Sequence, residues 1–160
     1  YSFPLELSFL ASRYKQLKEE LVPQDLFKSF TIADYYFMKS LVFAASTLTG
    51  DEYQLYRQIF YIIYSSLPKP DIYVYLHLST DRLIRNIEKR GRDYEKSITK
   101  EYLQKIQDSY FSFFKQNTEN KYLIIDVDNI DFVTNEDHYI KIVATIFFDE
   151  YTVGLNKVIL

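Results

Sequence analysis

The sequence predicts an α/β fold in which a parallel sheet is flanked by long helices. Residues 71–79 and 121–127 have the β-branched and aromatic composition of strands. Long helical stretches separate these two segments, which indicates crossover connections and therefore parallel strands. Three long helices come first along the chain, and two strands offer them too little sheet to pack on. We therefore expect further strands of this sheet to lie outside the 160 residues.

Helical periodicity predicts three helices in the first half of the chain, at residues 5–21, 33–48 and 52–67. The second is apolar on most sides, as a buried helix is. Residues that start or stop helices lie at the ends of these segments, and they are Pro4, Pro23, Gly50, Asp51, Pro68 and Pro70. We expect Gly50 to end the second helix and Asp51 to cap the third.

Side chains suited to helix N-caps precede three helices in the second half of the chain, and they are Ser79 or Thr80, Thr99 and Asn135. The helices that follow are predicted to end near Gly91, Asn117 and Phe148. The strand at residues 121–127 is apolar almost throughout, which is typical of a strand buried on both faces. The residues beyond Glu150 are left unassigned.

Composition excludes several classes of function. A chain of 160 residues that is 48% hydrophobic fits one domain, residues 1–160, with one core. The net charge of −3 provides no broad basic field for nucleic acid or an anionic membrane. No apolar run approaches the roughly 20 residues of a membrane span, and no signal peptide is evident, so we expect a cytoplasmic protein. Without cysteine, and with only His77 and His138, no metal site is expected.

A basic cluster surrounds one glycine in the segment that begins at Arg85 and includes Lys89, Arg90, Gly91 and Arg92. One interpretation is a helix C-terminus whose dipole attracts cations and whose glycine adopts a left-handed cap. The other is a mobile lid whose guanidinium groups close on transferring phosphates. The cluster alone does not decide between them.

Two further groups of charged side chains have two interpretations each. Glu6 and Arg13 lie seven residues apart, on one helix face, where they are either exposed or line a pocket that recognises a planar polar ligand. Asp126 and Asp128 follow the last predicted strand, where they either bind Mg²⁺ or cap the next loop, and we favour the cap.

Charges inside the apolar second helix are unusual. Asp34 and Lys39 lie there, five residues apart, so they do not face each other along the helix. Each would need a partner from elsewhere in the protein.

Several segments together resemble the deoxynucleoside kinase family, over almost the whole chain. They are SFPLELSFLASR (2–13), ADYYFMKSLVFA (33–44), EYQLYRQIF (52–60), KPDIYVYLHLSTDRL (69–83), IEKRGRDYEKSITKEYL (87–103) and LIIDVDNIDF (123–132). The segment at 87–103 is the most specific, because the family lid has an R-G-R, acidic residues and an E-Y-L at this spacing. The resemblance implies a P-loop kinase-like parallel sheet and a lid at residues 87–99.

The resemblance also implies roles for particular residues. Glu6 and Arg13 match the family's base-recognising Gln and the Arg two turns later, with Phe9 and Lys39 as further base-pocket residues. Arg90 and Arg92 match catalytic lid arginines, and Glu95 matches the glutamate that contacts the sugar 3′-hydroxyl. In the loop that covers the donor adenine, the matching residues are Asp128 and Phe132.

The chain departs from the better-known family members at three places. Ala33-Asp34-Tyr35 stands where they have an E-R-S motif, so the catalytic arginine of that motif is not carried over. Lys39 stands about where they have an acidic residue, and Asn86 replaces the first lid arginine. The resemblance to a bacterial branch implies a homodimer through residues 33–67, and relatives of that branch are sometimes fused to a folate-pathway pyrophosphokinase.

Glu6 in place of Gln changes the hydrogen bonds that the base can make. An ionised carboxylate only accepts hydrogen bonds, whereas Gln both donates and accepts. Guanine presents adjacent N1–H and N2–H donors, so a preference for deoxyguanosine or another purine is expected.

The family's phosphate-binding loop, G-x-x-x-x-G-K-[ST], does not occur in the sequence, whose three glycines are scattered. We expect this loop and its strands in an N-terminal segment outside the sequence, where they would hold ATP and Mg²⁺. The expected activity is phosphorylation of a deoxynucleoside 5′-hydroxyl, with these 160 residues inactive alone. A non-catalytic nucleoside-binding or dimerisation module and a thymidylate kinase are the alternatives, and the thymidylate kinase matches the lid and base pocket less well.

Overall fold

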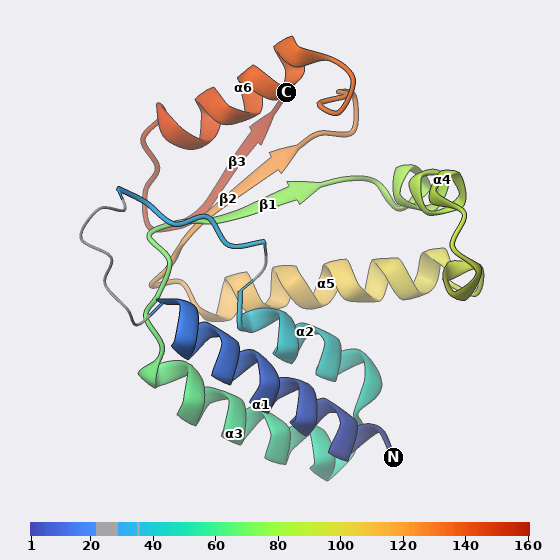
Figure 1. Ribbon diagram of the computed structural model, residues 1–160, viewed down its shortest axis with the longest axis vertical. Helices are drawn as coiled ribbons and strands as arrows, with labels where there is room; N and C mark the ends of the chain where they lie inside the picture. Colours follow the sequence, from blue (N-terminus) through green and yellow to red (C-terminus); the bar gives the residue numbers. More distant parts are fainter. Residues whose placement is uncertain (22–28, 35) are drawn as a thin grey trace. The chain divides into compact units, whose positions relative to one another are not determined.

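The computed structural model describes residues 1–21, 29–34 and 36–160. It contains two compact units, Tyr1–Lys69 and Pro70–Leu160. The first unit consists of the helices α1 (Ser2–Leu21), α2 (Met38–Thr47) and α3 (Gly50–Ser66) (Figure 1). The single domain expected for residues 1–160 stays a prediction.

Aromatic side chains form the core of the first unit, where each of the three helices contacts the other two. The Phe37 and Phe60 rings stack with centroids 5.0 Å apart, and Phe60 stacks on Tyr64 at 5.4 Å. Leu10 and Leu17 bring α1 into the same buried set. Burial of such large rings supplies most of the free energy that holds three helices together.

The helix boundaries in this unit differ from the predicted ones. α1 begins at Ser2, with Pro4 in its first turn. The second helix begins at Met38 and not at residue 33, so that prediction was wrong. Tyr36 is buried outside the helix and its hydroxyl donates to the Pro68 carbonyl, a tertiary contact that overrides the local periodicity. The helix stop predicted at Pro23 lies outside the described residues, and so does Tyr35 of the Ala33-Asp34-Tyr35 segment.

Gly50 was predicted to end the second helix, but it is the first residue of α3, and α2 ends at Thr47. Its φ of 56° lies in the left-handed region that glycine favours, which allows a sharp change of direction between the helices. Thr49 occupies the N-cap position predicted for Asp51, and it makes no side-chain capping bond. Asp51 instead lies in the first turn, where a carboxylate favours the helix dipole.

The second unit is a parallel sheet with helices. Its strands β1 (Tyr73–His77), β2 (Lys121–Asp126) and β3 (Gly154–Ile159) lie in the order β1-β2-β3 (Figure 1). Its helices are α4 (Thr80–Arg90), a short 3₁₀ helix η1 (Asp93–Glu95), α5 (Lys100–Gln116) and α6 (Glu136–Phe147). The predicted parallel α/β fold is confirmed in this unit. None of the described helices is long and apolar enough to cross a bilayer.

The predicted caps of this unit are present. Side chains at the N-caps accept hydrogen bonds from the first turn of α4, α5 and α6, and they are Ser79, Thr99 and Asn135. Gly91 follows α4 with φ 70° and ψ 27°, the left-handed conformation expected of a C-terminal glycine.

β3 lies beyond Glu150, in the part of the chain that was left unassigned from the sequence. Its Gly154 amide donates to the Asn120 carbonyl at 2.9 Å, and the amide of Leu160, just after the strand, donates to the Asp126 carbonyl at 3.2 Å. The strand is half-exposed and includes Asn156 and Lys157, so its composition lacks a strong strand signal. Pairing with β2, and not local propensity, determines this element.

β2 is buried on both faces, as its continuous apolar character predicted. Leu123 and Ile125 pack in one cluster with Ile142 of α6. On the opposite face, the Tyr122 ring lies 4.5 Å from the Phe114 ring of α5. α5 and α6 therefore cover opposite faces of the sheet (Figure 1).

Candidate functional site

Two polar bridges join α1 and α2 in the first unit. Thr47 Oγ1 donates to Glu6 Oε1 at 2.9 Å, and Arg13 Nη1 donates to Ser40 Oγ at 2.9 Å. Glu6 and Arg13 on α1 are seven residues apart, about two helical turns, and so are Ser40 and Thr47 on α2. The earlier residue on α1 contacts the later residue on α2, and the later one contacts the earlier. The two helices therefore run antiparallel, with the predicted residues Glu6 and Arg13 on the facing side of α1.

Ser40 and Thr47 were not predicted as site residues. They are two of the four polar side chains of α2, and they share a face because of their seven-residue spacing. That spacing equals the Glu6–Arg13 spacing on α1, which is the signal that could have identified them.

Glu6 is a buried carboxylate, only 8% exposed, so the interpretation of it as a solvent-facing residue was wrong. Its one hydrogen bond within the described part of the chain comes from Thr47, and no cation there lies within ion-pair distance. A carboxylate offers about four acceptor positions. Because a buried charge needs partners, the unused acceptors of Glu6 favour a ligand that donates hydrogen bonds.

Tyr56 of α3 is fully buried beside these bridges. Burial, and after it the Glu6 carboxylate, raises the pKa of Tyr56 well above its ordinary value, while a side-chain contact with Ser40 and the charge of Arg13 lower it. Ser40 is therefore the neighbour of the Tyr56 hydroxyl, at a geometry that falls short of a regular hydrogen bond.

The other predicted pocket residues of this unit lie nearby in the sequence. Phe9 is 47% exposed and follows Glu6 by three residues on α1, so its ring is available for a planar ligand. The Lys39 ammonium lies 5.8 Å from the centre of the Phe43 ring on its own helix. Asp34 is exposed and precedes α2, so the expectation of a charge inside an apolar helix was wrong for it.

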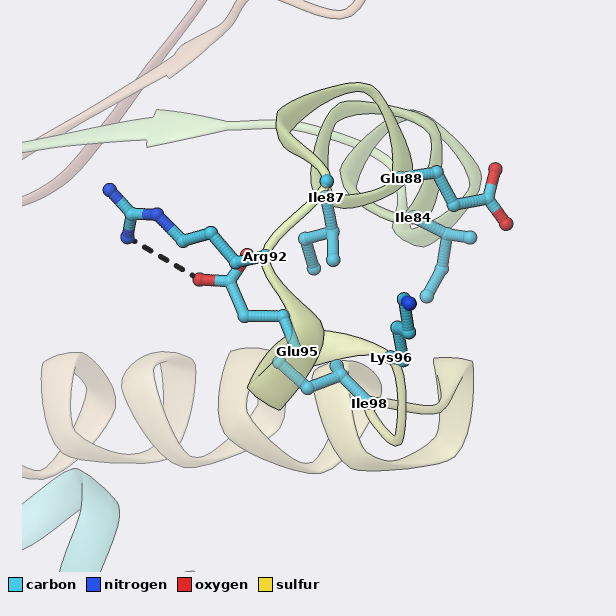
Figure 2. Close-up of a pocket in the computed structure, with 8 residues that line it drawn as sticks. Ile84, Ile87, Glu88, Arg92, Glu95, Lys96 and Ile98 are labelled. Atoms are coloured by element: carbon cyan, nitrogen blue, oxygen red, sulfur yellow. Dashed lines mark ion pairs between the residues drawn. The ribbon is translucent and has the colours of Figure 1, made fainter.

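Three predicted lid residues converge in the second unit. The guanidinium of Arg90 meets Glu95 Oε2 through Nε at 3.0 Å and Nη2 at 2.9 Å. Arg92 Nη1 lies 3.6 Å from Glu95 Oε1, and Figure 2 marks this ion pair with a dashed line. The left-handed Gly91 reverses the chain after α4, and this turn lets both arginines reach one carboxylate.

This geometry combines the two interpretations of the basic cluster. Gly91 does cap α4, but Arg90 and Arg92 do more than balance the helix dipole, because both pair with the buried Glu95. The arginine side chains are still 49% and 52% exposed, which leaves N–H donors facing solvent. A cavity of about 220 Å³ lies under the turn (Figure 2), and it is lined by Ile84, Ile87, Glu88, Gly91, Arg92, Glu95, Lys96 and Ile98.

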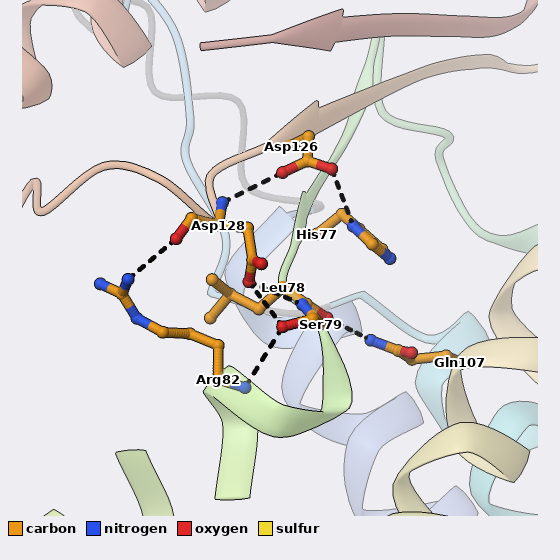
Figure 3. Close-up of polar contacts among 7 residues, drawn as sticks. All are labelled: His77, Leu78, Ser79, Arg82, Gln107, Asp126 and Asp128. Carbon is orange, nitrogen blue, oxygen red and sulfur yellow. Dashed lines mark hydrogen bonds and ion pairs between the residues drawn. The ribbon is translucent and has the colours of Figure 1, made fainter. Parts of the chain in front are cut away.

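The acidic residues after β2 tie the strand ends together (Figure 3). Asp128 Oδ1 accepts from the Ser79 amide at 2.9 Å and from the Ser79 hydroxyl at 2.8 Å, and these bonds lower the pKa of Asp128. Asp126 accepts from the Asp128 amide at 3.0 Å and contacts His77 Nδ1 at 3.4 Å. The loop-capping interpretation therefore holds. No group of three metal-ligating side chains exists in the described ranges.

The loop after β2 is linked to the start of α4. Arg82 Nη1 donates to the Asp128 carbonyl at 2.8 Å, and Nη2 donates to the Ile130 carbonyl at 3.3 Å (Figure 3). Phe132 is partly buried against the α6 side of the sheet. The loop predicted to cover a donor adenine is thus attached to the helix that leads into the lid.

The fold and these residues define an α/β protein with polar bridges between its first helices and an arginine–glutamate cluster after the helix that follows a parallel strand. Comparison with known families agrees, because the deoxynucleoside kinase model matches residues 1–150. The chain belongs to the deoxynucleoside kinase family.

Individual relatives show how far the similarity extends. A deoxyguanosine kinase of Bacillus subtilis (strain 168) is 38% identical over 149 residues, which are 90% of this chain and 72% of the relative. A deoxyadenosine kinase of Lactobacillus acidophilus is 24% identical over 84% of this chain and 67% of its own length. The solved structure of deoxyadenosine kinase from M. mycoides with bound dCTP matches with a TM-score of 0.69 and 24% identity, covering 92% of this chain and 74% of that one. The fold is thus the P-loop kinase fold.

The residues present fit the family's cofactors only in part. Arg90 and Arg92 offer guanidinium donors of the kind that bind the phosphates of ATP. No carboxylate cluster for Mg²⁺ exists in the described part of the chain, and no G-x-x-x-x-G-K-[ST] occurs in the sequence. No step that involves Mg²⁺ follows from these residues.

Replacing Glu95 with Gln is expected to release the lid. The glutamine amide has the shape of the carboxylate but lacks the charge that holds both arginines. The free energy needed to open the turn locally should therefore fall by roughly 1 to 2 kcal/mol, a figure that allows for solvent screening. Trypsin should then cut after Arg90 or Arg92 about tenfold faster, as measured by mass spectrometry. The matched control is Glu88→Gln, an exposed carboxylate on α4. Equal cleavage of both variants and the unaltered protein would contradict the clamp.

Replacing Ser79 with Ala should destabilise the protein more than replacing Thr99 with Ala. Both residues cap a helix, which is worth about 1 kcal/mol. Ser79 also donates to the Asp128 carboxylate in a charge-assisted bond to another element, whereas the capping bond of Thr99 lies within its own helix. Urea unfolding followed by circular dichroism measures the difference. If the two variants lose equal stability, the Ser79–Asp128 bond does not support the fold.

Proposed function

We propose that this chain binds a purine deoxynucleoside, deoxyguanosine first, for ATP-dependent phosphorylation of its 5′-hydroxyl. The observation that carries the proposal is the buried Glu6, whose carboxylate has hydrogen-bond acceptor positions that no described residue fills. The N1–H and N2–H donors of guanine match two adjacent acceptors, whereas N1 of adenine is itself an acceptor and meets Glu6 unfavourably. The 38% identity to a protein named deoxyguanosine kinase supports the same preference.

Each residue of the first unit has one proposed role in base recognition. Glu6 accepts from the base, and Thr47 holds its other oxygen in place. Arg13, which donates to Ser40, is the second proposed residue of the base site on the same face of α1. Phe9 offers a ring face on which a base can stack, and Lys39 stays a further candidate.

The lid residues of the second unit have two proposed roles. Glu95 accepts a hydrogen bond from the sugar 3′-hydroxyl, and Arg90 and Arg92 stabilise the charge of the transferring phosphate. Arginines that already hold one carboxylate are extended and ordered before phosphate arrives. They exchange one oxyanion partner for another, which costs less than ordering free side chains. The loop with Asp128 and Phe132 is the proposed contact for the donor adenine.

Phosphate transfer needs a phosphate-binding loop that the sequence does not contain. That loop would supply backbone amides and a lysine for ATP, chemistry that none of the three glycine positions here provides. We therefore propose that these 160 residues bind nucleoside but do not turn it over alone.

A non-catalytic binding module is the second candidate function, and the missing G-K-[ST] motif is the observation that favours it. The two functions differ in one assay. The gene product translated with any coding sequence upstream of Tyr1 either transfers phosphate from ATP to a deoxynucleoside or only binds the nucleoside. Turnover supports the kinase, and binding without turnover supports the module.

Replacing Glu6 with Gln is expected to change the base preference. Loss of the charge should weaken deoxyguanosine binding about tenfold or more, while deoxyadenosine should bind more tightly, because an amide can donate to N1 of adenine. Titration calorimetry with the four deoxynucleosides measures this. Glu19→Gln, an exposed carboxylate on α1, is the control. A preference of the unaltered protein for pyrimidines would contradict the proposal.

We also propose a homodimer through the second and third helices. Leu55 and Ile62 of α3 are 47% and 73% exposed and lie seven residues apart, so they form an apolar stripe on one helix face. Burying such a stripe against a second copy is favourable.

Replacing Ile62 with Glu should separate this dimer. In a symmetric dimer the two introduced carboxylates would be desolvated and would repel each other, which destabilises the interface. The mass measured by sedimentation equilibrium should therefore fall to that of a monomer. The control is Ile140→Glu, an exposed isoleucine of α6, which should leave the mass unchanged. A monomeric unaltered protein would refute the proposal.

A further inference from the structure

Arg82 of α4 holds two backbone carbonyls of the loop that follows β2. Its guanidinium group donates through Nη1 to the Asp128 carbonyl at 2.8 Å and through Nη2 to the Ile130 carbonyl at 3.3 Å (Figure 3). A guanidinium fork commonly pairs with a carboxylate or a phosphate. Here the carboxylate of Asp128 is bound to Ser79, and the fork holds two neutral carbonyls. Arg82 therefore fixes the course of the loop backbone and does not act as an ion-pair partner.

These two carbonyls belong to the residues on either side of Asn129, at the tip of a tight turn. The Ile130 amide donates to the Val127 carbonyl at 3.3 Å, which closes a four-residue turn. Asn129 is exposed there, and neither its backbone nor its side chain hydrogen-bonds to any other residue that the structure describes. The fork of Arg82 thus holds the residues before and after Asn129 and leaves Asn129 itself accessible.

The same turn is held a second time, through the side chain of Asp128. Ser79, the cap of α4, donates to the Asp128 carboxylate through its amide at 2.9 Å and through its hydroxyl at 2.8 Å. The hydroxyl oxygen of Ser79 also accepts from the Arg82 amide at 3.2 Å. The start of α4 thus fixes both the side chain and the backbone of the turn, and the same helix leads on to Arg90.

A loop binds a ligand more tightly when the loop is ordered beforehand. Backbone entropy that is lost on binding lowers the affinity, so a loop already fixed in its binding conformation loses less. Asn129 presents an amide N–H, a carbonyl and a side-chain amide, which are donors and acceptors of the kind that a nucleotide base requires. Arg82 need not touch such a ligand to affect its affinity, because it acts through the turn.

We infer that Arg82 is a positioning residue for the phosphate donor, because its two hydrogen bonds fix the turn that presents Asn129 to the donor base. The inference rests on the proposed function, in which this loop contacts the donor adenine. It adds a residue that acts through the loop and not by contact with a substrate. The affinity for ATP then depends on the first turn of α4, whereas the affinity for the nucleoside does not.

The test measures KM for ATP and KM for the deoxynucleoside that is turned over fastest, in the gene product translated with any coding sequence upstream of Tyr1. Arg82→Met keeps an apolar stem but removes both hydrogen bonds, so KM for ATP should rise about tenfold while KM for the nucleoside changes less than about twofold. Arg82→Lys keeps the charge without the fork, so it should recover part of this loss and leave KM for ATP about threefold raised. Lys141→Met removes an exposed cation from α6 and is the control, which should change neither KM.

Hydrogen exchange of the backbone amides at residues 127–134 measures the order of the loop directly. Without ligand, these amides should exchange faster in Arg82→Met than in the unaltered protein, and Lys141→Met should leave their exchange unchanged. Equal exchange in Arg82→Met and the unaltered protein overturns the inference.

The split between the two KM values separates positioning from a purely structural role. A variant that only folds less well loses kcat or shifts both KM values alike, and either result overturns the inference. Full recovery by Arg82→Lys also overturns it, because the charge would then suffice without the fork. If the unaltered protein turns over nucleoside but Arg82→Met shows no split, only this inference falls. If the unaltered protein has no turnover, the proposed function falls and this inference falls with it.

Discussion

The pairing of buried carboxylates is the constraint on which both units depend. An ionised carboxylate removed from water costs several kcal/mol unless charges or donors compensate it. Glu95 meets this requirement within its own unit, through Arg90 and Arg92. Glu6 meets it only in part, through one threonine hydroxyl. Glu95 therefore holds the turn after α4 in place, whereas Glu6 has acceptor positions that no described residue fills.

The compensation of Glu95 explains the form of the lid. A single left-handed glycine brings the end of α4 back toward η1, so that cations from the helix end and the following residue reach the same carboxylate. Ser79, at the other end of α4, is held by Asp128. α4 is thus anchored at its start by the strand ends and leads at its end to arginines that remain half-exposed. A fixed base and an accessible tip are what the proposed phosphate-binding role of Arg90 and Arg92 would require.

The sequence predicted well wherever a local rule decides the structure. The caps at Ser79, Thr99 and Asn135, the left-handed Gly91 and the buried β2 follow from propensity and periodicity. Prediction failed where distant contacts decide. β3 exists because β2 pairs with it, and the start of α2 is moved by the burial of Tyr36. Ser40, Thr47 and Tyr56 escaped notice for the same reason, since only packing of three helices brings them to Glu6 and Arg13.

The proposed base site would divide a chemical task between side chains. In the better-known family members, which this chain resembles, a glutamine amide presents a donor and an acceptor together. An ionised Glu6 offers only acceptors, so any donor to the base must come from a neighbour. Thr47 donates to Glu6, and Arg13 donates to Ser40 in the second bridge between the same two helices. The packing of α2 against α1 therefore decides which donors stand beside the carboxylate, and a change of one residue on α1 shifts part of its task to the helix that faces it.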